Sequence, residues 1–214
     1  MSFLEVARLI AILGLVICVF GILFRLKEIM NRPFKKDLAR VRGSDGRGVL
    51  YAFTLGMAPW EKESTRIHWF AYLRGIFFHI GVFAAFGVLF ASPWLAQLPA
   101  VVIWIALAVT GLGALAGYGG ILTRLVDPNL RALSIPDDYF SVFLTSSFAA
   151  AAALALGLPA ALPVFYLATA VMAVSIPFSK VRHCVYFFYS KFFFGQHYGH
   201  RGVLAPTDHT YLEG

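Results

Sequence analysis

The fold is decided by an apolar run at residues 70–92, FAYLRGIFFHIGVFAAFGVLFAS. It contains one formally charged side chain, Arg74, and one histidine, His79. A bilayer's hydrocarbon core is about 30 Å thick and needs about 20 helical residues, so this run is long enough to cross it as one helix.

Four further runs approach the same length, at residues 3–24, 99–122, 139–157 and 161–179. Hydrophobic residues make up 59% of the 214, charged residues only 14%, and the mean hydropathy is +0.75, which excludes an ordinary soluble domain. We therefore predict an all-α fold, an integral membrane bundle of five transmembrane helices that forms a single domain over residues 1–214. The first run is expected to stay in place as a membrane anchor, because it lacks the features of a cleaved signal peptide.

Positive charge is concentrated in a loop at residues 25–67 and a tail at 180–214, whereas the turns at 93–98 and 158–160 carry none. The positive-inside rule places this loop and tail in the cytoplasm, with the N-terminus outside and the C-terminus inside. This distribution explains the net charge of +7 better than a nucleic-acid partner does. We predict a multi-pass protein of the inner (cytoplasmic) membrane, surrounded by lipid.

The tail begins with an aromatic segment, residues 178–194, in which a cation recurs every few positions. Aromatic and basic side chains together favour the boundary between headgroups and hydrocarbon. We predict a C-terminal interfacial aromatic helix.

His79 is the first candidate for chemistry, because an ionisable group within a span is costly and marks a functional site by default. It follows Arg74 by five residues, which places it about 7–8 Å below the cytoplasmic interface. Gly75 and several aromatic residues share its helical face, so a bulky neighbour would fit there.

His183 is the second candidate, since it follows Lys180 at the inner end of the fifth run. The topology derived from charge brings it to the same leaflet as His79 on a different helix. A haem held between two imidazoles requires that arrangement. The alternatives are a His79 that hydrogen-bonds a neighbouring helix and a His183 that is an ordinary interfacial residue.

Other polar residues have two interpretations. The candidates for pairing with haem propionates are Arg74, Arg124, Arg131 and Arg182, although the positive-inside rule also explains arginines at that level. His68, together with His197 or His200, leaves open a second cofactor outside the hydrocarbon core. The glycines of 111–120 indicate either tight helix packing or clearance for a cofactor or quinone. Asp137 is interpreted either as a helix cap or as a proton donor to quinone.

Three motifs resemble a known family. They are Phe78-His79-Ile80-Gly81, the loop Arg124…Asp127-Pro128…Arg131, and Pro177-Phe178-Ser179-Lys180…His183. Over residues 70–185 the chain resembles the membrane cytochrome b (gamma) subunit of respiratory nitrate reductase and its relatives in heterodisulfide-reductase-like and sulfite-reductase-associated complexes.

The resemblance implies that His79 and His183 are the axial iron ligands of the haem b nearer the cytoplasm. It also implies a cytoplasmic iron–sulfur or flavoprotein subunit as redox partner. Family members with two haems carry a second histidine pair, but the matching positions here are Leu89 and Phe165. We therefore predict one haem b.

A single haem on one side covers only part of the core of about 30 Å. The expected function is a membrane anchor and electron-transfer subunit that passes electrons between a quinone pool and the cytoplasmic partner, with substrate chemistry on another chain. The alternative is a haem-free anchor or scaffold subunit of such a complex.

Overall fold

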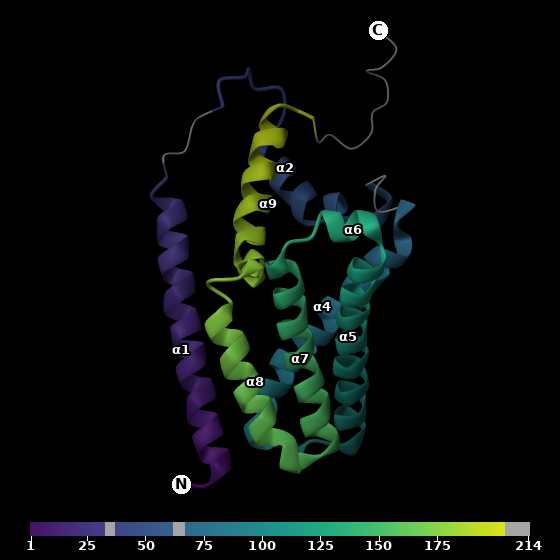
Figure 1. The fold of residues 1–214 in the computed structure, drawn as a ribbon. Helices are drawn as coiled ribbons and strands as arrows, with labels where there is room; N and C mark the ends of the chain where they lie inside the picture. Colours follow the sequence, from purple (N-terminus) through teal and green to yellow (C-terminus); the bar gives the residue numbers. More distant parts are fainter. Residues whose placement is uncertain (33–36, 62–66, 204–214) are drawn as a thin grey trace. The chain divides into compact units, whose positions relative to one another are not determined.

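The computed structural model describes residues 1–32, 37–61 and 67–203, and over these residues it is helical with no strand (Figure 1). The α-helices are α1 (Phe3–Met30), α2 (Asp45–Phe53), α4 (Trp69–Ala91), α5 (Ala100–Val126), α6 (Pro128–Ala132), α7 (Pro136–Gly157), α8 (Leu162–Ser175) and α9 (His183–His200). Short 3₁₀ turns lie at η1 (Leu55–Met57), η2 (Pro59–Glu61), η3 (Ser92–Gln97), η4 (Pro159–Ala161) and η5 (Lys180–Arg182). The prediction of an all-α chain is confirmed for the described residues.

Several helices have the length and apolar character of membrane spans. Within the described ranges these are α1, α4 continued through η3 (Trp69–Gln97), α5 and α7. The count of four becomes five if α8 and α9, which are separated by a break, together form one span. The chain is therefore a multi-pass membrane protein.

The fifth predicted span differs from the observed helix. Helix α8 ends at Ser175 and has 14 residues, a length of about 21 Å, which is short of a full crossing. Pro177 explains the end, because proline has no N–H to donate to the carbonyl four residues earlier and its ring clashes with that carbonyl. The run at 161–179 is therefore a helix followed by a turn that contains Pro177, and the 3₁₀ turn η5 begins after it at Lys180.

The chain forms two compact units, described here one at a time. The first comprises Met1–Lys27 and Phe70–Arg182, and the second Glu28–Trp69 and His183–Gly214.

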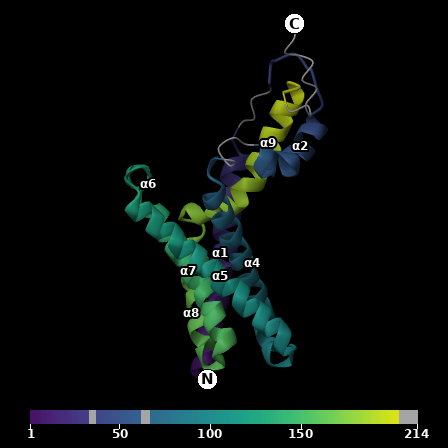
Figure 2. The same ribbon diagram turned by 90° about the vertical axis from the view of Figure 1, so that its right-hand side faces the viewer.

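In the first unit, neighbouring helices touch at positions that lack large side chains. A Cβ atom at Gly81 of α4 would clash with the Cα atom of Gly113 on α5. Another at Gly14 of α1 would lie 2.9 Å from the Cα atom of Ala170 on α8, and Figures 1 and 2 show α1 and α8 side by side. Small residues let helix backbones approach in lipid, where hydrophobic burial does not drive association.

The Gly81 contact gives a first prediction. Gly81→Ala forces α4 and α5 apart and should lower the free energy of unfolding by about 1–3 kcal/mol, as overpacking does. Gly87→Ala is the matched control on the same helix, because nothing lies within 4 Å of its added Cβ atom. Reversible SDS unfolding in mixed micelles measures both variants, and equal stability of the two would contradict the assigned contact.

In the second unit, α2 packs on α9 through backbone contact as well. Added Cβ atoms at Gly48 of α2 would clash with Gly195 and Gly199 of α9. The ring of Phe53 stacks on Phe188 at 6.4 Å and meets the edge of Phe187 at the same distance. The predicted helix after residue 178 is thus present as α9, and α2 covers one of its faces.

Asp37 joins the segment before α2 to the end of α9. Its carboxylate accepts bonds from Arg201 Nε at 2.8 Å and Nη2 at 3.2 Å, and lies 3.2 Å from Nδ1 of His197. Close by, the amides of Arg42 and Gly43 donate to the carbonyl of His200. The Arg201 guanidinium, helped by the Ala39 amide, holds the pKa of Asp37 well below its usual range.

This cluster gives a pH-dependent prediction. Because the folded-state pKa of Asp37 is lowered, its contribution is complete above the ordinary value of 3.8 and is lost as the pH falls below that value. Hydrogen exchange at the Arg42 and Gly43 amides, corrected for intrinsic rates, should therefore accelerate at acid pH. In Asp37→Asn it should already be fast at neutral pH.

Asp45→Asn serves as the control for Asp37→Asn. It removes the same charge from the first residue of α2, and it loses one contact, of 3.4 Å to His200. A variant Asp37→Asn that exchanges no faster than Asp45→Asn would show that the carboxylate does not hold this segment.

Candidate functional site

His79 is fixed by its own helix. Its Nδ1 lies 2.7 Å from the carbonyl oxygen of Gly75, one turn earlier on α4. A carbonyl only accepts, so Nδ1 is the donor in this bond, and in the tautomer with one N–H the lone pair lies on Nε2. Metal-ligating histidines have this arrangement, because a backbone carbonyl on one nitrogen sets the tautomer and orients the other.

The imidazole lies on the outward face of α4. The buried residues of this helix are Gly81, Ala85, Val88 and Leu89. His79 precedes Gly81 by two residues, about 200° around the helix, and is exposed. An exposed ionisable group within a span is costly in lipid, so this face favours a bound group over hydrocarbon.

Gly75 leaves room on that face. A Cβ atom added at Gly75 would meet nothing within 4 Å. Phe83, one turn after His79, is 68% exposed. The predicted association of Gly75, His79 and an aromatic neighbour is therefore present on α4, with open space beside Gly75.

Two of the predicted arginines have partners inside the first unit. Arg74 points to α5, where its Nη1 donates to Thr123 Oγ1 at 2.9 Å, rather than to the face of His79. Arg124 donates to Ser134 Oγ at 3.0 Å and so ties the end of α5 to the chain after α6. Arg131 on α6 is exposed and Arg182 in η5 is half-buried. All four lie at the end of the first unit where α5 finishes and α7 starts.

His183 is the first residue of α9 and is exposed. It belongs to the second unit, whereas His79 belongs to the first. Their pairing around one iron atom stays a prediction.

The remaining histidines have other surroundings. His197 lies 3.2 Å from the Asp37 carboxylate. The ring of His200 is 3.4 Å from the Asp45 carboxylate and 3.1 Å from the Ala39 carbonyl oxygen. These contacts give both histidines a structural role in the second unit, which the sequence analysis missed because the partners are far apart in the chain. His68, just before α4, is exposed.

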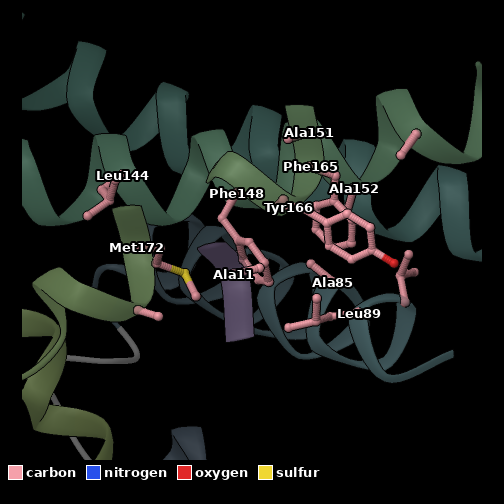
Figure 3. Packing of buried hydrophobic residues seen from close by; sticks show 14 of the residues in the cluster. Ala11, Ala85, Leu89, Leu144, Phe148, Ala151, Ala152, Phe165, Tyr166 and Met172 are labelled. Atoms are coloured by element: carbon pink, nitrogen blue, oxygen red, sulfur yellow. The ribbon is translucent and has the colours of Figure 1, made fainter. Parts of the chain in front are cut away.

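Leu89 and Phe165, which stand where two-haem family members carry their second histidine pair, lie in the core of the first unit. Leu89 is 8% exposed and Phe165 is completely buried. The ring of Phe165 stacks on Phe148 at 5.5 Å and on Tyr166 at 6.3 Å, and Figure 3 shows these rings together, with Leu89 in the same cluster. Side chains fill the interior around both positions.

The buried ring at 165 gives a stability prediction. Phe165→Ala should lower the free energy of unfolding by about 3–5 kcal/mol, since it leaves a cavity in packed surroundings. Phe90→Ala removes the same ring from a side chain that is 72% exposed and should cost far less. Thermal unfolding in detergent, followed by circular dichroism, compares the two, and similar losses would contradict the described core.

A polar cluster that the sequence analysis did not assemble lies where α7 begins. Asp138 accepts from the Ile135 amide at 2.9 Å, as expected of a cap residue, and also from Lys180 Nζ at 2.7 Å. Asp137 accepts from the Lys180 amide at 3.0 Å. The cap that the sequence indicated at this helix start is made by Asp138, and nothing in the sequence indicated Lys180.

The glycines of 111–120 on α5 differ in their surroundings. Gly113 contacts α4, and a Cβ atom at Gly117 would clash with Ser146 of α7 and the ring of Phe78. Gly119, by contrast, has open space around it. The tight-packing interpretation thus holds for Gly113 and Gly117.

Comparison with known proteins gives no match: no family model, curated protein or solved structure is significantly similar to this chain. The resemblance to membrane cytochromes b stays a prediction from the motifs quoted above.

Proposed function

We propose that this chain is the haem b-containing membrane anchor and electron-transfer subunit of a respiratory oxidoreductase complex. It passes electrons between a quinone pool and a cytoplasmic iron–sulfur or flavoprotein partner. In this proposal His79 and His183 are the axial ligands, the N-terminus is outside, and the chain lies in the inner membrane.

The observation that carries the proposal is the Nδ1 hydrogen bond of His79 to the Gly75 carbonyl. It presents Nε2 as the electron-pair donor, which is what an iron ligand requires. It does so on an outward face of a membrane-length helix where Gly75 leaves space. A haem bound there supplies reversible one-electron transfer.

Two further features support a single haem near one membrane surface. At the end of the first unit Arg131 is exposed and Arg182 is half-buried, and these cations would receive propionates. Side chains pack closely around Leu89 and Phe165, and this core occupies the positions at which a second haem would be held.

The proposal is tested on the purified protein by a reduced-minus-oxidised spectrum and a pyridine haemochrome assay. We expect one haem b per chain, lost in His79→Ala and in His183→Ala. His68→Ala is the control, because it removes an exposed histidine just before the same helix. Two haems per chain, none, or full retention in His79→Ala would overturn the proposal, and none would favour the haem-free anchor.

Quinone reactivity has its own measurement. Added quinol should reduce the haem band in membranes that contain the wild-type complex. A band that dithionite reduces but no quinol reduces would remove the quinone from the proposed function.

A further inference from the structure

The start of α7 holds the chain that leads into α9. Lys180, the first residue of η5, is bound at two points by consecutive carboxylates. Its backbone amide donates to Asp137 Oδ2 at 3.0 Å, and its ammonium group lies 2.7 Å from Asp138 Oδ1. All three residues belong to the first unit.

Each carboxylate is itself oriented by a second donor. The hydroxyl of Ser141 donates to Asp137 Oδ1 at 3.0 Å, and the amide of Ile135 donates to Asp138 Oδ2 at 2.9 Å. The side chain of Asp138 is only 16% exposed. Both oxygens of each group therefore have a partner, which leaves the carboxylates little freedom to rotate.

Only Val181 and Arg182 lie between Lys180 and His183 in the sequence. The intervening turn is closed by Arg182 N donating to Ser179 O at 3.3 Å and Val181 N donating to Ser179 Oγ at 3.3 Å. Ser179 is 5% exposed. The restraint on Lys180 thus passes through a short, hydrogen-bonded turn to the backbone of His183.

We propose that Asp137 and Asp138 are positioning residues for His183. By fixing Lys180 they restrain the backbone that leads into His183, and so limit the freedom with which its side chain binds the iron. This inference rests on the proposed function. Residues behind a metal ligand commonly contribute in this way, and their loss typically weakens metal binding about 10–100-fold.

The central experiment replaces each member of the ion pair in the full chain. Asp138→Asn keeps an acceptor for the Ile135 amide but loses the charge, and Lys180→Met removes the same pair from the other side. We expect both to fold and to bind haem roughly tenfold more weakly. Part of their low-spin signal in electron paramagnetic resonance should become high-spin, because His183 no longer holds the iron in every molecule.

Asp127→Asn is the matched control. Asp127 also caps a short helix at this end of the first unit, by accepting from Asn129 and Leu130, but it does not contact Lys180. It should keep the wild-type haem affinity and low-spin signal, which separates positioning from a general change in charge. Lys180→Arg, which preserves the pair, should restore most of the signal lost in Lys180→Met.

The outcomes are distinguishable. Asp138→Asn and Lys180→Met with wild-type haem affinity and spectrum, even with a lowered melting temperature, would overturn the positioning role and leave the proposed function intact. A wild-type protein that binds no haem would overturn both. Equal loss in Asp127→Asn would also overturn the positioning role.

Discussion

The constraint on which the structure depends is contact between helix backbones at positions without large side chains. Lipid tails are as apolar as the side chains, so moving an apolar side chain from lipid into a helix interface gains little free energy. Helices in a membrane therefore associate through close packing. Gly81 against Gly113 fixes how α4 crosses α5, and Gly14 against Ala170 fixes α1 on α8. Because Gly81 must face α5, the face about 200° away, which carries His79, is turned outward. The glycine contact thus decides which side of the unit presents the imidazole.

Polar groups buried inside the first unit are hydrogen-bonded within that unit. The hydroxyls of Thr110 and Thr169 donate to carbonyls one turn earlier, and Tyr166 donates to Ser92 across helices at 2.9 Å. Among the described residues, no buried side-chain nitrogen or oxygen lacks a partner. These groups are neutral hydroxyls, which suits helix packing rather than proton transfer. Arg74, Arg124, Asp137, Asp138 and Lys180 lie instead toward the end of the unit where α7 begins, whereas Glu5 and Arg8 lie in the first turns of α1.

What the sequence predicts well here is what depends on neighbours along the chain. The apolar runs at 3–24, 70–92, 99–122 and 139–157 all correspond to helices, and the shared face of Gly75 and His79 follows from the helical repeat. The break after Ser175 was missed because the run at 161–179 carries no charged residue, although Pro177 was a visible signal for it. The bonds of Asp37 to Arg201 and of Asp137 to Lys180 join residues far apart in the chain. No local pattern indicates such pairs, because packing of the helices brings them together.

The two proposed ligands differ in how their geometry is encoded. His79 is oriented by a carbonyl four residues earlier, so any sequence that keeps α4 helical keeps the imidazole in place. His183 follows a proline break, and the residues that restrain its backbone come from α7, more than forty positions away. A metal-binding histidine that follows such a break can turn toward the iron in more than one direction, but its backbone lacks the rigidity of a continuous helix. In the proposed role, the carboxylates of Asp137 and Asp138 restore rigidity to the backbone before His183 by holding Lys180.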